Sequence, residues 1–150
     1  MADQRTHLNF GVPIGAGYGL VRSEGQPPLA RALETLGGAW GAQWGARCPD
    51  WIDVPTNSYY RSIAHGIVPA IGFGGWAMKN LQAAQDQLRG WADGHAAARL
   101  LATTPAMELW HACCEALLRF LAGALAGFIA GYASHLALDL FTPRSLPLLC

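Results

Sequence analysis

The chain has 150 residues, which suits one domain, and 52% of them are hydrophobic whereas only 13% are charged. Ten basic and ten acidic residues cancel to zero formal charge, and Lys79 is the one lysine, so the basic surface that nucleic-acid binding requires is missing. The high apolar content also excludes a disordered chain. We expect a single domain, residues 1–150, that buries most of its side chains in its own core or in lipid.

Apolar blocks separated by glycine and proline predict an all-α fold, because no stretch alternates apolar and polar residues for long. The first block covers residues 7–22 and begins at His7. Paired prolines make residues 23–28 a predicted turn, since a proline disfavours helix in the residue before it. The second block, about residues 29–46, carries Trp40 and Trp44 on one helix face. A compact bundle of Gly-rich helices follows from this pattern.

Ionisable residues stand next to the apolar blocks in the middle of the chain. Asp50 and Asp53 follow the second block at a predicted turn, and His65 lies one helical turn after Arg61 in the next apolar run, residues 62–78. Taken singly, each has a structural explanation: a helix cap for Asp50, a carbonyl hydrogen bond for His65 and a solvated end for His7. Charged groups at membrane depth are costly, however, and usually serve a function.

The last third of the chain predicts two helices. Residues 79–99 have apolar residues at steps of three and four, which indicates an amphipathic helix. Thr104 offers an N-cap and Pro105 a first helical position for a long helix that ends near Leu140. Glu115 and Arg119 lie four residues apart in it and are expected to pair.

Cysteine usage predicts reduced structural thiols. The four cysteines have no spacing typical of a zinc site or a disulfide framework. They are Cys48, Cys113, Cys114 and Cys150.

Three charge-free runs raise the question of a membrane, because a spanning helix needs about 20 apolar residues. Residues 120–138 form the best spanning candidate, with 19 residues. Residues 6–21 and 62–78 are shorter and are interrupted by glycine and one proline each. We expect a protein that is integral to, or tightly associated with, a membrane, while a compact soluble helical domain stays open as the alternative.

The last helix carries the strongest local pattern. Gly123, Gly127 and Gly131 recur every fourth residue, which allows a close approach by another helix, either within the chain or from a second copy. His135 and Asp139 follow at the same spacing. A histidine and an aspartate one turn apart can ligate one metal ion, or one can orient the other. With His7, Asp50 and His65 they form the mixed set of histidines and carboxylates found in hydrolytic zinc or manganese sites.

The chain resembles the DUF457 (YdjM-like) family of bacterial membrane-bound metal-dependent hydrolases. The most specific segment runs from Gly131 to Pro143 in the order Gly-Tyr-x-x-His-x-x-x-Asp-x-x-Thr-Pro. Weaker matches are Thr6-His7-Leu8, Pro49-Asp50 with a second aspartate close behind, and Arg61 through His65. The resemblance implies an inner-membrane location and metal or active-site roles for a set of five residues. They are His7, Asp50, His65, His135 and Asp139.

Four positions depart from the family pattern. Val54 stands where a histidine is common, and three further substitutions fall around Arg61 and His65. Those three are Tyr60, Ala64 and Gly66.

Two functions are compatible with these residues. The first is metal-dependent hydrolysis of a phosphoester or a lipid-like substrate, with zinc favoured over manganese, Asp50 as ligand or general base, and Arg61 binding an anionic group. The second is a non-catalytic helical membrane protein that binds a regulatory partner, because the departures also fit lost activity. Membrane lipid is the expected partner, nucleic acid is not, and a helix-mediated homo-oligomer is an open possibility.

Overall fold

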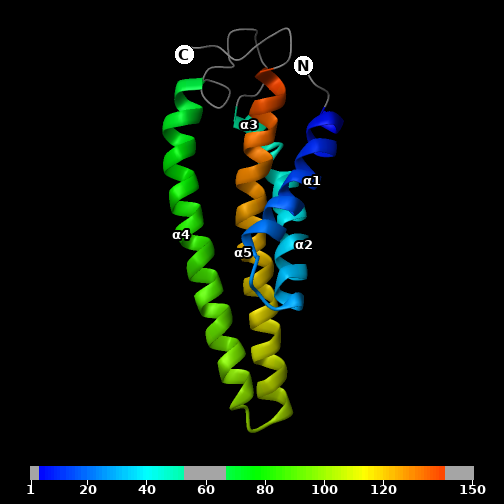
Figure 1. Ribbon diagram of the computed structural model, residues 1–150, viewed down its shortest axis with the longest axis vertical. Helices are drawn as coiled ribbons and strands as arrows, with labels where there is room; N and C mark the ends of the chain where they lie inside the picture. The colour runs from blue at the N-terminus through cyan, green and yellow to red at the C-terminus, as the bar shows by residue number, and fades with distance from the viewer. Residues whose placement is uncertain (1–3, 53–66, 141–150) are drawn as a thin grey trace.

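A computed structural model describes residues 4–52 and 67–140, and this part of the chain is helical throughout, apart from short connections (Figure 1). The all-α prediction is therefore confirmed. Four long helices run side by side, and a helix of one turn caps the bundle near the start of α1 and the end of α5. Their bounds are α1 Gln4–Arg22, α2 Pro28–Gly45, α3 Cys48–Ile52, α4 Ile67–Leu100 and α5 Pro105–Leu140.

Helices α1, α2 and α5 pack together through glycine and alanine. Gly123, Gly127 and Gly131 of α5 lie against the backbone carbonyls of α2, so the predicted glycine stripe makes its close contact within the chain. Gly15 and Gly19 of α1 contact the α2 backbone in the same way, at the carbonyls of Gly38 and Glu34 that the α5 glycines also approach. The fully buried apolar side chains in this part of the chain are all alanines, which is what allows three backbones to approach so closely.

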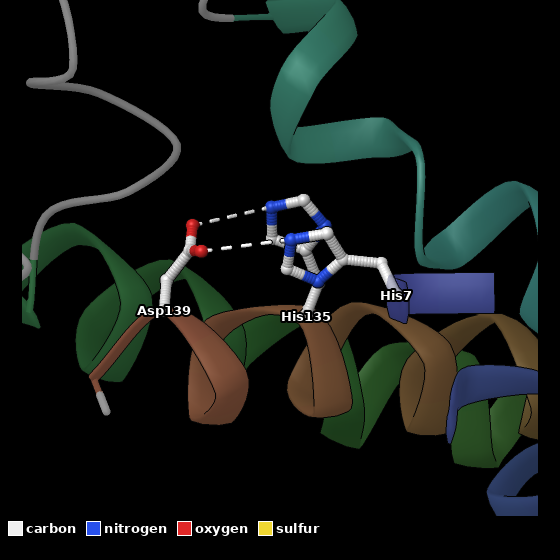
Figure 2. Close-up of side chains that lie close together, drawn as sticks. All are labelled: His7, His135 and Asp139. Carbon is white, nitrogen blue, oxygen red and sulfur yellow. Dashed lines mark ion pairs between the residues drawn. The ribbon is translucent and has the colours of Figure 1, made fainter. Parts of the chain in front are cut away.

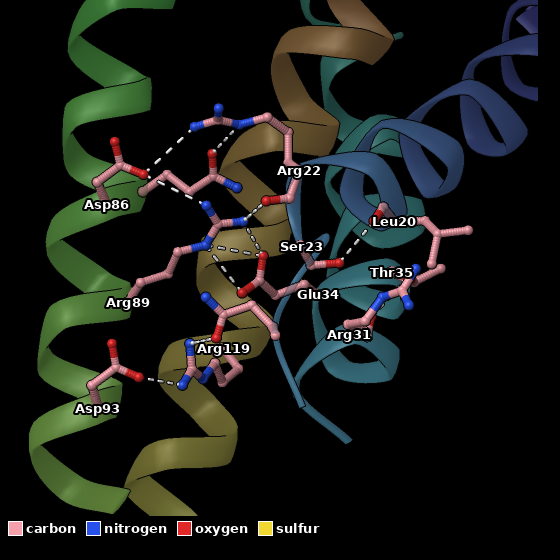
Figure 3. Close-up of polar contacts among 12 residues, drawn as sticks. Leu20, Arg22, Ser23, Arg31, Glu34, Thr35, Asp86, Arg89, Asp93 and Arg119 are labelled. Atoms are coloured by element: carbon pink, nitrogen blue, oxygen red, sulfur yellow. Dashed lines mark hydrogen bonds and ion pairs between the residues drawn. The ribbon is translucent and has the colours of Figure 1, made fainter. Parts of the chain in front are cut away.

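Helix α4 is attached differently. Its backbone packs against α5, whereas it reaches α1 and α2 through polar side chains. Figure 3 shows these bridges between α4 and the end of α1 and start of α2. Arg89 of α4 forms a buried ion pair with Glu34 of α2, and its Nη2 also donates to the carbonyl of Arg22, 2.6 Å away. Long polar side chains thus fill the space between α4 and the three-helix unit.

Two predicted boundaries differ from the structure. Residues 67–100 form one helix of 34 residues, although the sequence suggested separate blocks over 62–78 and 79–99. Pro69 is compatible with this helix because it occupies the third position, where the backbone N–H has no intrahelical partner in any case. Asp50 lies inside α3 rather than in a turn. Pro13 lies inside α1, which nevertheless continues to Arg22.

The start of α5 is as predicted. The hydroxyl of Thr104 accepts a hydrogen bond from the backbone N–H of Met107 at 3.3 Å, and Pro105 is the first helical residue. We expect Thr104→Ala to lower the free energy of unfolding by about 1 kcal/mol, because one N–H at the helix end loses its acceptor. Chemical denaturation in detergent measures this loss. Thr103→Ala is the control and should change stability by less than about 0.5 kcal/mol, because its hydroxyl caps no backbone group.

Several polar side chains are buried, while many large apolar side chains are exposed. Glu34 and His135 are fully buried and Arg119 is nearly so. The large apolar side chains lie outside, including Leu29 at 69% exposure and Val21 at 66%. One helix among the described residues, Pro105–Asp139, is long and apolar enough to cross a membrane.

Candidate metal centre

Three buried side chains with metal-ligating atoms meet near the end of the bundle that α3 caps (Figure 2). His7 comes from the first turns of α1, and His135 and Asp139 come from consecutive turns of α5. One ligating atom from each lies within 4.8 Å of the other two. His135 Nε2 is 3.4 Å from Asp139 Oδ2, and His7 Nε2 is 3.6 Å from Asp139 Oδ1. Both imidazoles therefore turn a ring nitrogen toward the same carboxylate.

Asp50 of α3 adds a second carboxylate to this group. Its Oδ1 lies 3.7 Å from His135 Nε2, so this nitrogen is close to the carboxylates of both Asp50 and Asp139. The Asp50 side chain is 28% exposed, whereas those of His7, His135 and Asp139 are at most 6% exposed. Asp50 is therefore the most exposed of these four residues, and a small molecule can reach the metal-ligating atoms from its side.

A backbone carbonyl fixes the orientation of the His135 ring. His135 Nδ1 lies 2.6 Å from the carbonyl oxygen of Ala46, which can only accept, so Nδ1 carries the proton. In the neutral ring the lone pair is then on Nε2, which faces the two carboxylates. A histidine that ligates a metal usually donates its other N–H in this way.

The two imidazole rings are stacked. Their centroids lie 3.9 Å apart and the ring planes differ by 13°. This contact requires α1 to approach α2 and α5 closely, and Gly11, one turn after His7, allows it: a Cβ there would lie 3.0 Å from the Cβ of Ala46. The small residues of α1 and α2 thus place His7 over His135.

The distances suit a metal ion better than direct hydrogen bonds. At 3.4 to 3.7 Å the nitrogen–oxygen pairs are too long for good hydrogen bonds. Ligand atoms bound about 2.0–2.2 Å from a tetrahedral ion lie roughly 3.3–3.6 Å apart. The donor set therefore fits an ion such as Zn²⁺ or Mn²⁺.

Four of the predicted site residues are brought together by the fold: His7, Asp50, His135 and Asp139. His135 and Asp139 are neighbours on α5, whereas His7 and Asp50 come from distant parts of the sequence, on α1 and α3. Arg61, His65 and Asp53 lie outside the described residues, as do the four departures from the family pattern. Their predicted roles stay predictions.

Cys48 lies two residues before Asp50 on α3. Burial raises the pKa of its thiol above the usual value, because the thiolate would lose hydration. The thiol is therefore protonated at neutral pH. Cys113 and Cys114 are also free thiols, and Cys150 lies beyond the described residues.

The sequence reasoning missed the buried ionic contacts of α4. Glu34 received no role, although an acidic residue among Gly37, Gly38 and Gly41 on the buried face of an apolar helix was a usable signal. The predicted pair between Glu115 and Arg119 is wrong. Arg119 Nη2 instead contacts Asp93 of α4 at 2.5 Å, and Glu115 contacts Arg99 of α4 at 3.2 Å. Both residues therefore form ion pairs with α4 instead of with each other.

Comparisons with protein-family models, with curated proteins and with solved structures found no match to this chain. The geometry of the described residues is therefore the basis for the function proposed below.

Proposed function

We propose that this protein is a membrane-bound, metal-dependent hydrolase of phosphoester or similar bonds. The observation that carries the proposal is the convergence of two histidines and two aspartates around His135 Nε2, with Nδ1 of the same ring hydrogen-bonded to Ala46. The resemblance to the DUF457 family supports the same reaction class.

The ligands are assigned from burial and orientation. His7, His135 and Asp139 are buried and would hold the ion, with His65 as a further ligand implied by the resemblance. A bound divalent ion would lower the pKa of a water molecule to near neutrality and so supply a nucleophile. Zinc is favoured because the set is rich in imidazole, and manganese is the alternative.

Asp50 is best placed to move a proton. Its carboxylate faces His135 from the exposed side of the group, so it can reach both the ligands and an incoming molecule. Arg61 would bind an anionic substrate group, as the resemblance implies, because a guanidinium matches phosphate bidentately.

The reaction is tested with purified protein in detergent, using p-nitrophenyl phosphate and a phospholipid as substrates. We expect metal-dependent hydrolysis, and we expect Asp50→Asn to lower kcat by about 10²-fold or more, since a general base usually contributes that much. Asp86→Asn is the control, because Asp86 is an exposed aspartate on α4, away from the group. Absence of hydrolysis with every metal tried, or equal kcat for both variants, contradicts the proposal.

The proposed membrane location rests on the surface of α1, α2 and α5. Their outer faces carry large apolar side chains such as Phe10, Leu36 and Leu121, while their contacts with one another use glycine and alanine. α1 has 19 residues and α2 has 18, which makes them roughly 27–29 Å long, close to the hydrocarbon thickness of a bilayer. We place lipid against these three helices and propose the bacterial inner membrane as the location.

Extraction of isolated membranes tests this location. We expect the protein to remain in the pellet after carbonate treatment and to dissolve in mild detergent, because apolar helices leave a bilayer only when another apolar phase replaces it. Release by carbonate alone would show that no helix spans the membrane and would favour the soluble alternative.

The non-catalytic alternative predicts a different response to substitution. In that case the buried histidines and Asp139 serve only to hold the bundle together. Asp139→Asn would then reduce stability to the same extent with and without added metal, whereas a metal centre makes the loss depend on metal. The glycine stripe is already covered by α2, so a homo-oligomer would have to use a different surface.

A further inference from the structure

A second pair of histidines lies in the hairpin formed by α4 and α5. His95 of α4 and His111 of α5 place their Nδ1 atoms 2.9 Å apart, with ring centroids separated by 5.2 Å. Both side chains are half-buried, so small ions can reach them. His111 precedes His135 by 24 residues on the same helix, which is about 36 Å along its axis. The pair is therefore separate from the candidate metal centre.

The sequence spacing around this pair resembles that of the first site. Glu115 follows His111 by four residues, as Asp139 follows His135, and the second histidine again comes from a neighbouring helix. The Glu115 carboxylate contacts Arg99 Nη1 at 3.2 Å. Its Oε2 atom is buried and accepts no hydrogen bond, so the ion pair is the contact that holds it. Arg99 thus competes for the carboxylate that stands one turn from His111.

We infer that His95 and His111 form a second binding site, for a divalent transition metal that accepts ligand angles near 90°, such as Ni²⁺ or Cu²⁺, with Glu115 as a third ligand once Arg99 releases it. Imidazole nitrogens prefer these metals. Two nitrogens bound at about 2.05 Å with an angle near 90° lie about 2.9 Å apart, which matches the separation of the Nδ1 atoms.

Metal binding here needs a change of tautomer, a rotation of the rings that turns both Nδ1 lone pairs toward the ion, and the release of Glu115 by Arg99. In the neutral pair one Nδ1 donates its proton to the other Nδ1. When both Nδ1 atoms bind an ion, the donating ring keeps its proton on Nε2 instead, so no net proton leaves the pair. The two rings are already in contact, so metal binding does not have to bring α4 and α5 together.

Calorimetric titration of the detergent-purified protein with Ni²⁺ tests the site. We expect His95→Gln and His111→Gln each to weaken one binding event by more than about tenfold, since each removes one of two nitrogen ligands. His135→Gln is the matched control and should leave this event unchanged, because His135 belongs to the other centre. Circular dichroism confirms that each variant is folded. A binding isotherm for His95→Gln identical to that of the wild type would overturn the site.

The role of Glu115 is tested separately. Arg99→Gln should raise the affinity for Ni²⁺ several-fold, because the carboxylate is freed, and Glu115→Gln should lower it. Unchanged affinity in both variants would overturn the assignment of Glu115 as the third ligand. These results do not depend on hydrolysis or on the ligands of the first centre, so they distinguish a failure of this inference from a failure of the proposed function.

Discussion

Gly127→Ala should cost at least about 3 kcal/mol of the free energy of unfolding, because the added methyl group meets the backbone of α2 rather than a movable side chain. A Cβ at this position would lie 2.7 Å from the Cα of Gly38 and still nearer to its carbonyl group. The two helices would have to separate along the contact that organises the bundle. Unfolding in detergent, followed by circular dichroism, measures the loss.

Gly90→Ala is the matched control. Gly90 lies in the middle of α4, and an added Cβ there would meet nothing within 4 Å. This substitution should therefore raise stability by about 0.5–1 kcal/mol, since alanine is the better helix former. If Gly127→Ala and Gly90→Ala had similar effects, the close packing of α2 on α5 would be contradicted.

Glu34→Ala should destabilise the protein by about 3–5 kcal/mol, because it leaves the guanidinium of Arg89 without its buried carboxylate. The Glu34 side chain is fully buried and that of Arg89 is 12% exposed, and three short contacts join them. Figure 3 shows that this pair stands at the centre of the polar bridges to α4. The midpoint of chemical unfolding reports the effect.

The double variant Glu34→Leu with Arg89→Met should recover most of this loss, because apolar side chains of similar volume need no charge partner. Asp86→Ala provides the exposed comparison. Its carboxylate is 64% exposed and contacts Arg22 and Arg89 at 3.5 Å, so its removal should cost less than about 1 kcal/mol. A Glu34→Ala variant that is as stable as Asp86→Ala would show that the buried pair does not hold α4 in place.

The sequence predicted those features that depend on local signals. Thr104 and Pro105 marked the start of α5, and the paired prolines marked the turn before α2. The glycine stripe predicted a close helix contact but did not reveal whether the contact lies within the chain or between copies. Only the position of α2 settles that point. Pro69 suggested a break in the helix. The helix is continuous because Pro69 lies in the first turn of α4, where a proline is tolerated.

Partners that lie on other helices were harder to predict. Spacing alone placed Glu115 beside Arg119, yet each binds a residue of α4. At the candidate metal centre, helical spacing predicts the pair His135 and Asp139 but not the positions of His7 and Asp50. Those two residues were predicted from their chemical type and from the family resemblance. Small residues such as Gly11 and Ala46 allow the helices that carry His7 and Asp50 to pack close to His135. This packing involves several helices, so no single segment of the sequence predicts it.

The metal content of the purified protein tests the central claim most directly. Protein extracted in detergent without chelators, then dialysed to remove weakly bound ions, should retain about one zinc or manganese ion per chain by elemental analysis. His135→Ala should lose that ion while His111→Ala keeps it, because only His135 belongs to the buried group with His7 and Asp139. A wild-type protein without a transition metal, or an unchanged content in His135→Ala, would contradict a metal centre at this site.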